Sequence, residues 1–200
     1  MSNGRDSNVG RVQQTLAANA GDARAILDQL ESLAGPLGRA ADLIQNALLG
    51  GSKLLCCGNG GSAADCAHLT AEIAARYKLD RRGYAAIDLT ANHSLTTALI
   101  NDFPPVELFC RQIEAIGSRG DVLMAFSTTG RSENIRLALQ AARQSKLHTI
   151  AMLGGDGGPC RDAADITLIV PSTTTARIQE MHLLLYHTIC EVIDPALAAG

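Results

Sequence analysis

The segment KLLCCGNGGSAADCAHLTAEIAARY, residues 53–77, joins a short apolar run to a glycine-rich turn and then to a stretch of strong helix formers. KLLCCG (53–58) has the length and composition of a buried strand, and Ser62 occupies the expected N-cap position of the following helix. This order of strand, glycine turn and helix predicts the first βα unit of a parallel sheet.

Four more short apolar runs follow, separated by helical segments such as ENIRLALQAARQSK. They are YAAIDL (84–89), DVLMAFS (121–127), HTIAML (148–153) and DITLIV (165–170). Five strands that alternate with helices predict an α/β fold: a five-stranded parallel sheet flanked by helices in three layers, with a ligand site beyond the carboxyl ends of the strands. Residues 9–49 show helical apolar spacing with an expected break at Gly35–Pro36, so two helices precede the first strand.

The composition fits one structural domain, in which helices of residues 1–50 pack on a domain formed by residues 51–200. The formal net charge of -3 and the lack of a Lys/Arg cluster argue against a nucleic-acid partner. The N-terminus has no apolar signal region and no apolar run approaches a membrane span, so we expect no membrane association and a cytoplasmic location. Six scattered cysteines without a C-x-x-C pair predict small buried side chains in a reducing compartment rather than a zinc site.

The glycine turn GNGGSA (58–63) formally matches the dinucleotide fingerprint G-x-G-x-x-A. That fingerprint needs an acidic residue at the end of the second strand, whereas Asp80 precedes this strand and Asp88 lies within it. An amide, two flexible glycines and a hydroxyl at a helix N-terminus also suit a sugar or a phosphate. The candidate ligand residues are Asn59, Gly60, Gly61 and Ser62, and a purely structural tight turn remains an alternative.

The segment STTGRSEN (127–134) places four hydroxyls where a strand ends and a helix begins, on Ser127, Thr128, Thr129 and Ser132. Hydroxyls, loop N–H groups and the helix dipole can together hold a phosphate dianion without a lysine. An N-capped helix with a polar loop is the alternative, but capping accounts for one hydroxyl and not for four. The segment therefore predicts a phosphate loop.

His68 and Glu72 lie four residues apart on one predicted helix and share a face. They could bind one metal, act as an acid/base couple, or form an ordinary surface pair. The C-terminal segment ARIQEMHLLLYHTICEVIDPAL is apolar around its whole circumference, which predicts burial in an oligomer interface. On this helix Gln179 and His187 are separated by about 12 Å and about 80°, so they share a broad face, whereas His182 lies on the other side and is expected to be structural.

With these residues in view, the chain resembles the sugar isomerase (SIS) family and, within it, the phosphoheptose isomerases. The resemblance covers residues from about 53 to 194 and rests on motifs that occur in the family's order. These motifs are CGNGGSAAD, HLTAE, ARY, IND, STTGRSEN, DGG and ARIQEMH, with a histidine eight residues after the glutamine.

This resemblance implies a cytoplasmic homotetramer with active sites between subunits, and one zinc ion per subunit. The implied zinc ligands are His68, Glu72, Gln179 and His187, with Glu72 and His187 also acting as the acid/base pair. The implied reaction converts sedoheptulose 7-phosphate to D-glycero-D-manno-heptose 7-phosphate through an enediol, for the heptose of lipopolysaccharide or a related glycan. The family's sugar contacts match Asn59, Ser62, Arg76 and Asp102, and its phosphate loop matches Ser127, Thr128, Thr129 and Ser132.

Three departures from the family pattern concern substrate choice more than reaction type. Thr129 stands where serine is common, NDFPPVE has two prolines in place of a glycine-containing turn, and PSTTTARIQ lacks an acidic residue before the glutamine. A rival function within the same family is a non-catalytic tetrameric scaffold that binds the replication initiator DnaA. Those relatives typically lack the residues that match Glu72 and His187, and this chain has both, which favours the enzyme.

Overall fold

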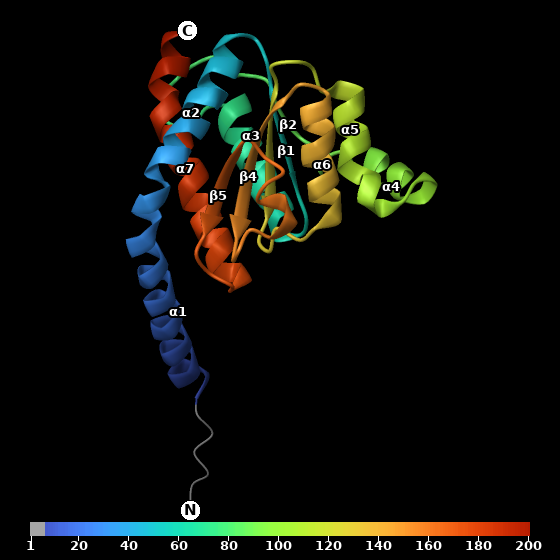
Figure 1. Ribbon diagram of the computed structural model, residues 1–200. Helices are drawn as coiled ribbons and strands as arrows, with labels where there is room; N and C mark the ends of the chain where they lie inside the picture. Colours follow the sequence, from blue (N-terminus) through green and yellow to red (C-terminus); the bar gives the residue numbers. More distant parts are fainter. Residues whose placement is uncertain (1–6) are drawn as a thin grey trace, which may run out of the picture.

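The computed structural model describes residues 7–200 and contains one parallel sheet of five strands in the order β2-β1-β3-β4-β5 (Figure 1). The strands are β1 (Leu54–Gly58), β2 (Ala86–Asp88), β3 (Val122–Ser127), β4 (His148–Gly154) and β5 (Ile166–Val170). All five overlap the runs that the sequence predicts, so the predicted α/β fold is confirmed. Because the chain leaves β1 toward β2 and later pairs β3 on the other side of β1, the sheet has its topological switch point between β1 and β3.

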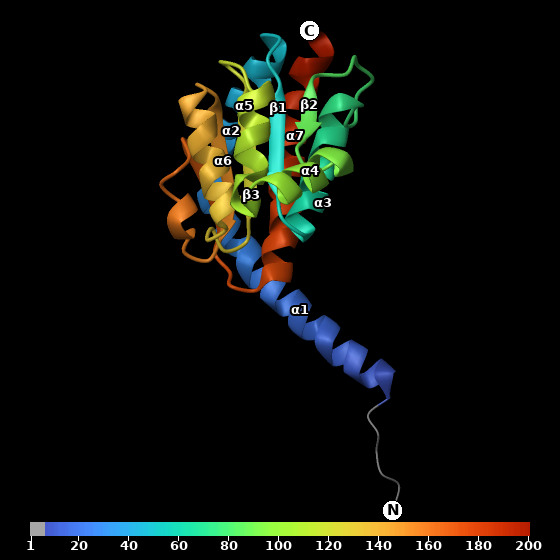
Figure 2. The same ribbon diagram turned by 90° about the vertical axis from the view of Figure 1, so that its right-hand side faces the viewer.

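Helices cover both faces of the sheet (Figures 1 and 2). They are α1 (Asn8–Leu30), α2 (Ala34–Leu49), α3 (Gly61–Ala74), α4 (His93–Asp102), α5 (Leu108–Ile116), α6 (Glu133–Gln144) and α7 (Thr175–Ala199), with 3-10 turns at Glu31–Leu33, Pro105–Glu107 and Gly158–Cys160. One core packs α2, α3 and α7 against the sheet, and the other packs α5 and α6. Alternate strand residues serve the two cores, as Cys56 and Cys57 do on β1.

Three predicted boundaries were wrong in detail. The N-terminal helices are interrupted at Glu31–Leu33 rather than at Gly35–Pro36, because Pro36 lies in the first turn of α2, where a missing N–H breaks no helical bond. Ser62 is not the N-cap of α3, which is Gly60 with φ 57°, a left-handed conformation that favours glycine. α3 also ends at Ala74, so Arg76 and Tyr77 follow the helix instead of completing it.

The cysteines behave as predicted. All six are free thiols; Cys110 is half-buried and the other five are buried in the two cores. Among residues 7–200, no helix is long and apolar enough to cross a membrane.

The long helix α7 is less uniformly covered within one chain than its composition suggests. Most of its apolar side chains are buried, but Leu184 is 42% exposed and Val192 is 60% exposed. α1 projects from the body (Figures 1 and 2) and carries Val9, Val12 and Leu16, each more than 60% exposed. This is the distribution expected if both helices contact other subunits, which remains a prediction.

Candidate active site

The two polar loops of the sequence meet at the topological switch point. Asn59 follows β1 and Asn134 is the second residue of α6, and their side-chain amides exchange two hydrogen bonds of 3.0 and 2.9 Å. The sequence predicted a ligand site beyond the carboxyl ends of the strands, and the paired amides join the loops that follow two of those ends. Asn134 itself received no separate role from the sequence.

The start of α3 is packed closely against α7. A methyl group at Gly61 would overlap the side-chain amide of Gln179, so the absence of a side chain there admits the glutamine. Ser62 is 3% exposed and faces inward rather than into solvent. Gln179 therefore lies beside the GNGGS turn, at the N-terminal end of α3, where helix N–H groups and the helix dipole favour oxygen-rich ligands.

The hydroxyls of the predicted phosphate loop are arranged around the end of β3. Ser127 Oγ accepts a hydrogen bond from the N–H of Gly130 and lies 3.3 Å from Ser132 Oγ. Thr129 Oγ1 accepts from the N–H of Arg131. Ser132 is the N-cap of α6, yet its side chain makes no capping hydrogen bond, so its hydroxyl is available to a ligand. Side-chain capping of α6 by Ser132 is thus not observed, whereas Ser127 and Thr129 do make hydrogen bonds within the loop, so a phosphate loop remains a prediction.

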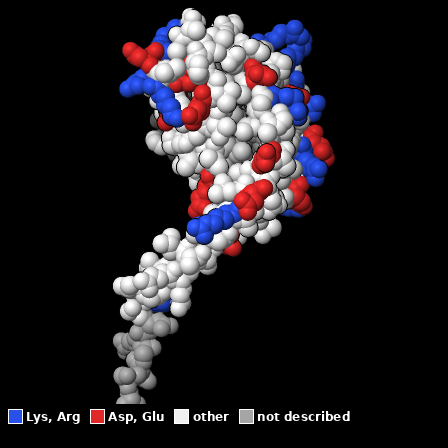
Figure 3. Space-filling model, turned by 90° about the vertical axis from the view of Figure 1, so that its left-hand side faces the viewer, with Lys and Arg blue, Asp and Glu red and all other residues white. Residues whose placement is uncertain are grey.

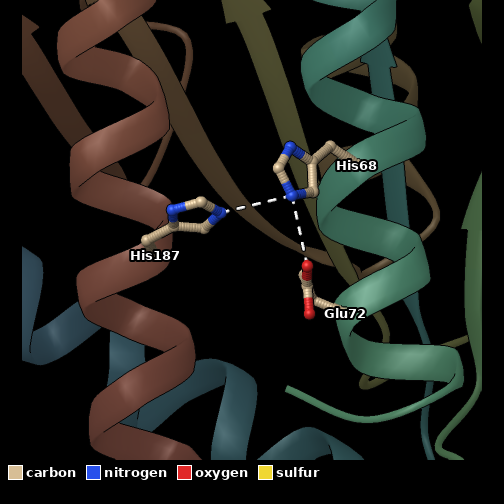
Figure 4. A group of neighbouring side chains, drawn as sticks. All are labelled: His68, Glu72 and His187. Atoms are coloured by element: carbon tan, nitrogen blue, oxygen red, sulfur yellow. Dashed lines mark hydrogen bonds and ion pairs between the residues drawn. The ribbon is translucent and has the colours of Figure 1, made fainter. Parts of the chain in front are cut away.

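Three side chains from α3 and α7 point toward one another (Figure 4). His68 Nε2 lies 3.1 Å from Glu72 Oε1 and 3.3 Å from His187 Nε2. One ligand atom from each of the three residues can be chosen so that all lie within 4.8 Å of one another. The His68–Glu72 pair is thus more than an intrahelical surface contact, because a third polar side chain from a distant part of the sequence joins it.

The surroundings of this cluster favour an uncharged His187. Burial, and then the neighbouring His68, lower the pKa of His187, while Glu72 acts in the opposite direction. Just inside the cluster, burial raises the pKa of the Asp65 carboxyl to about 6, against the opposing influence of His68. Burial, and then the charge on Asp65, hold the pKa of the Tyr186 hydroxyl above its usual range.

Two of these residues were missed by the sequence reasoning. Tyr186 is fully buried, and its hydroxyl lies 3.1 Å from His68 Nδ1, on the side of the imidazole opposite to Glu72. Asp65 is 9% exposed, and its Oδ2 has no hydrogen-bond partner among the described residues. The available signals were weak: Asp65 stands three residues before His68, and Tyr186 directly precedes His187 in an apolar run.

His182 lies apart from the cluster, as predicted. It is fully buried, and its Nε2 is 3.0 Å from the carbonyl oxygen of Leu153 at the end of β4. Burial lowers the pKa of His182 to about 4. The residue is a structural link between α7 and the sheet.

The remaining candidate residues lie on exposed segments. Arg76 follows α3 and donates to the carbonyl oxygen of Lys78 at 3.4 Å, and Asp102 ends α4, where it accepts from Asn101 at 2.7 Å. Within one chain these contacts are local. Neither residue joins the group formed by His68, Glu72 and His187.

A cavity of about 780 Å³ borders the phosphate loop at Thr128 and Thr129, on the side of α1. Its wall includes hydroxyl, amide and charged groups, from Asp22, Gln29, Ser172, Thr173, Thr174 and Arg177. It does not include His68, Glu72 or His187. We therefore locate the candidate active site by the convergence of these three side chains and not by this cavity.

A buried ion pair fixes the end of α3 against α7. Arg81 Nε donates to Asp194 Oδ1 at 2.9 Å, and the same guanidinium donates to the carbonyl oxygens of Ile73 and Glu72. Asp194 also accepts from the backbone N–H groups of Lys78 and Leu79. Burial alone would raise the pKa of Asp194, but these hydrogen bonds hold it below its usual value. The clamp ties the backbone of Glu72 to the helix that carries His187.

The donor set of the cluster suits a divalent metal. Two imidazoles and a carboxylate are ligand types that zinc accepts, and an amide such as Gln179 can add an oxygen. The sequence motif proposed all four residues as ligands. The structure brings His68, Glu72 and His187 together and places Gln179 against Gly61.

Comparison with known proteins finds relatives of similar sequence and similar fold. The family model described as SIS domain matches residues 20–154. Phosphoheptose isomerases of Aliarcobacter butzleri and Geobacter sulfurreducens are 47% and 46% identical to the chain, over 84% and 87% of its length and 89% and 93% of their own. The structure of phosphoheptose isomerase from Neisseria gonorrhoeae aligns with a TM-score of 0.85 and 39% identity, covering 92% of this chain and 99% of that one.

A second solved structure, a phosphoheptose isomerase from Francisella tularensis, aligns with a TM-score of 0.86 and 30% identity over 94% of this chain and 99% of that one. The fold and the polar loops define a SIS domain. The chain belongs to this family, and within it to the phosphoheptose isomerases. The predicted family is thereby confirmed.

Proposed function

We propose that the protein isomerises sedoheptulose 7-phosphate to D-glycero-D-manno-heptose 7-phosphate, a precursor of glycan heptose. The observation that carries this proposal is the meeting of His68, Glu72 and His187 between α3 and α7. The membership of the chain in a family of isomerases supports the reaction type. The hydroxyl-rich loop at the end of β3 supports a phosphorylated substrate.

An aldose–ketose exchange needs two proton transfers, from C1 to C2 and from the C1 oxygen to the C2 oxygen. We assign the carbon transfer to Glu72, which removes a C1 proton to give the enediol and returns the proton to C2. We assign the oxygen transfer to His187, which takes the proton of the C1 hydroxyl and delivers it to the C2 oxygen. An imidazole that is uncharged at neutral pH can accept that proton, which agrees with the lowered pKa of His187.

A zinc ion would be held by His68, Glu72, Gln179 and His187, of which three already have ligand atoms within 4.8 Å of one another. When bound, zinc supplies positive charge that stabilises the oxygens of the enediol. Glu72 then combines the roles of ligand and base. Gln179 of α7, whose side-chain amide lies beside Gly61 at the N-terminus of α3, orients the sugar end of the substrate.

The other contacts follow from the loops. The hydroxyls of Ser127, Thr128, Thr129 and Ser132 and the N-terminus of α6 bind the phosphate. The sugar hydroxyls are bound by residues at the end of β1 and on two further segments: Asn59, Gly60, Gly61, Ser62, Arg76 and Asp102. Arg76 and Asp102 make only local contacts within one chain, which is expected if they serve a site that a neighbouring subunit completes.

We further propose that the working form is a homotetramer. The face seen in Figure 3 carries few charged side chains over its centre and along the projecting helix, and the exposed apolar residues of α1 and α7 would be covered by other subunits. Of residues 1–50, those that the structure describes (7–50) then serve mainly to pack on the domain of residues 51–200 and on the neighbouring subunits, and residues 1–6 lie outside the described part. Six free, largely buried thiols are consistent with the cytoplasm as the place of action.

The test supplies zinc-loaded protein with sedoheptulose 7-phosphate and follows the sugar by NMR. We expect a heptose aldose phosphate from the wild type and a loss of about 10²–10⁴-fold in rate for Glu72→Gln, the range typical of a general base. Glu114→Gln, at an exposed site on α5, is the matched control and should be fully active. An unchanged ketose with the wild type would refute the proposal and bring the DnaA-binding scaffold forward.

A further inference from the structure

Tyr186 places its hydroxyl beside Nδ1 of His68, the ring nitrogen that contacts neither Glu72 nor His187. His68 Nδ1 lies 3.1 Å from the Tyr186 hydroxyl, while His68 Nε2 faces Glu72 and His187. The ring of Tyr186 is fully buried and packs edge-on against the rings of both histidines, with centroids 5.6 Å and 4.9 Å away. Tyr186 is therefore held in place by the core and touches His68 from the inner side.

An imidazole that binds a cation through Nε2 must carry its proton on Nδ1. In that tautomer Nδ1–H donates to the oxygen of the Tyr186 hydroxyl, which must direct its own proton elsewhere. Without a cation, Nε2–H can donate to Glu72 while the tyrosine hydroxyl donates to Nδ1. A hydroxyl can both donate and accept, so it can hydrogen-bond to His68 Nδ1 with or without a cation bound. Going from one arrangement to the other moves a proton between the two ring nitrogens by exchange with water and leaves the imidazole neutral.

Asp65 supplies the hydrogen-bond acceptor that the tyrosine hydroxyl requires in the cation-bound arrangement. Its side chain lies one turn before His68 on α3, is 9% exposed, and has an Oδ2 without a hydrogen-bond partner among the described residues. No hydrogen bond joins Asp65 to the Tyr186 hydroxyl in this structure, so the acceptor role requires the two side chains to approach each other when a cation binds. A buried carboxylate oxygen left unpaired is costly, so a role as acceptor for the tyrosine proton accounts for its position.

We propose that Tyr186 is a positioning residue for the metal ligand His68: its hydroxyl accepts the Nδ1 proton, keeps Nε2 free for the cation, and passes its own hydrogen bond to Asp65. The inference rests on the proposed metal site and names two residues that the family motifs do not assign. Partners of this kind fix the tautomer and orientation of a ligating histidine, and removing one typically weakens metal binding by about 10–100-fold.

The experiment measures the zinc affinity of the full-length protein by competition with a chromophoric chelator. Tyr186→Phe keeps the ring and removes only the hydroxyl, and we expect its zinc affinity to fall by about 10–100-fold. Tyr84→Phe is the matched control, because it removes another buried tyrosine hydroxyl that donates to α7, at the carbonyl oxygen of Leu197, far along the helix from His187. The control should bind zinc within about twofold of the wild type, since it contacts no proposed ligand.

Asp65→Asn keeps the shape of the side chain and removes its charge, and it should weaken zinc binding in the same direction. A second measurement does not depend on any variant folding: long-range ¹H–¹⁵N correlation spectra of the zinc-loaded wild type should show His68 protonated at Nδ1 and bound through Nε2. Equal zinc affinities for Tyr186→Phe and Tyr84→Phe, or a His68 bound through Nδ1, would overturn the inference. Zinc binding that follows these expectations in a protein without isomerase activity would instead refute the proposed function alone.

Discussion

Acid should selectively weaken the link that His182 makes between α7 and the sheet. Burial lowers the pKa of His182 from 6.5 to about 4, so the unfolded chain binds a proton more readily than the folded one. The stability that the neutral imidazole contributes is therefore complete above pH 6.5 and is lost as the pH falls toward 4. Because one pH unit between the two pKa values is worth about 1.4 kcal/mol, the whole effect is about 3 kcal/mol.

The measurement compares the unfolding free energies of wild type and His182→Gln in urea, at one protein concentration and with chelator present. At pH 7.5 the variant should be the less stable, since it disturbs a packed core and the hydrogen bond to Leu153. By pH 4.5 the difference in unfolding free energy between the two proteins should have shrunk by about 2.5 kcal/mol. The reason is that His182 is protonated in the unfolded wild type at this pH, whereas its burial disfavours protonation in the folded state, and the variant has no imidazole at this position. The other titrating groups are common to both proteins and cancel.

His148→Gln is the matched control, since His148 is exposed at the start of β4 and should change the comparison little. A difference between wild type and His182→Gln that stays constant within about 0.5 kcal/mol from pH 7.5 to 4.5 would contradict the reasoning. It would mean that His182 is hydrated in the folded protein, and that α7 is not sealed against β4.

Three further changes test the site. Gly61→Ala should lower kcat/KM by about tenfold, because the new methyl displaces the Gln179 amide at a cost of about 1.4 kcal/mol. Steady-state kinetics that match the wild type would count against the close contact between Gly61 and Gln179. Asp194→Asn leaves the buried Arg81 without its ion-pair partner and should reduce the free energy of unfolding in urea by about 3–5 kcal/mol, whereas a loss below about 1 kcal/mol would show that the clamp is dispensable. Ser132→Ala should raise the KM for the sugar phosphate and the inhibition constant of inorganic phosphate together, by about fivefold, and a change in only one of them would place the phosphate elsewhere.

The fold was predictable because a parallel strand buried on both faces is an uninterrupted apolar run, and all five runs were short. The expected alternation with helices fails once, between β4 and β5, where only the 3-10 turn Gly158–Cys160 intervenes. Helix boundaries were harder. Serine is the usual N-cap, so Ser62 was the natural choice, but Gly60 adopts a left-handed φ and starts α3 earlier. Pro36 marked a helix break in the wrong place, since proline in the first turn of a helix costs nothing.

The site was predictable only in part. The four-residue spacing places His68 and Glu72 on one face, but which element faces them depends on how α3 crosses α7, and local sequence does not encode that crossing. The family motif supplied His187, and the structure brings it to the pair. Tyr186 counted as one more apolar residue of α7, because its polar atom matters only once α3 is packed beside it.

The position of the Arg81–Asp194 clamp explains how the side chains of His68 and Glu72 can stay partly exposed to solvent. His68 and Glu72 both lie on α3 and are 44% and 23% exposed as side chains, so their mutual attraction is weakened by water and does not hold α3 against α7. The clamp lies deeper, with both side chains at most 3% exposed, and it binds the backbone carbonyl of Glu72 itself. The buried Arg81–Asp194 pair thus holds the end of α3 against α7, and this packing does not depend on His68, Glu72 or His187. It follows that mutations in the clamp should misplace Glu72 without touching any group that contacts the substrate.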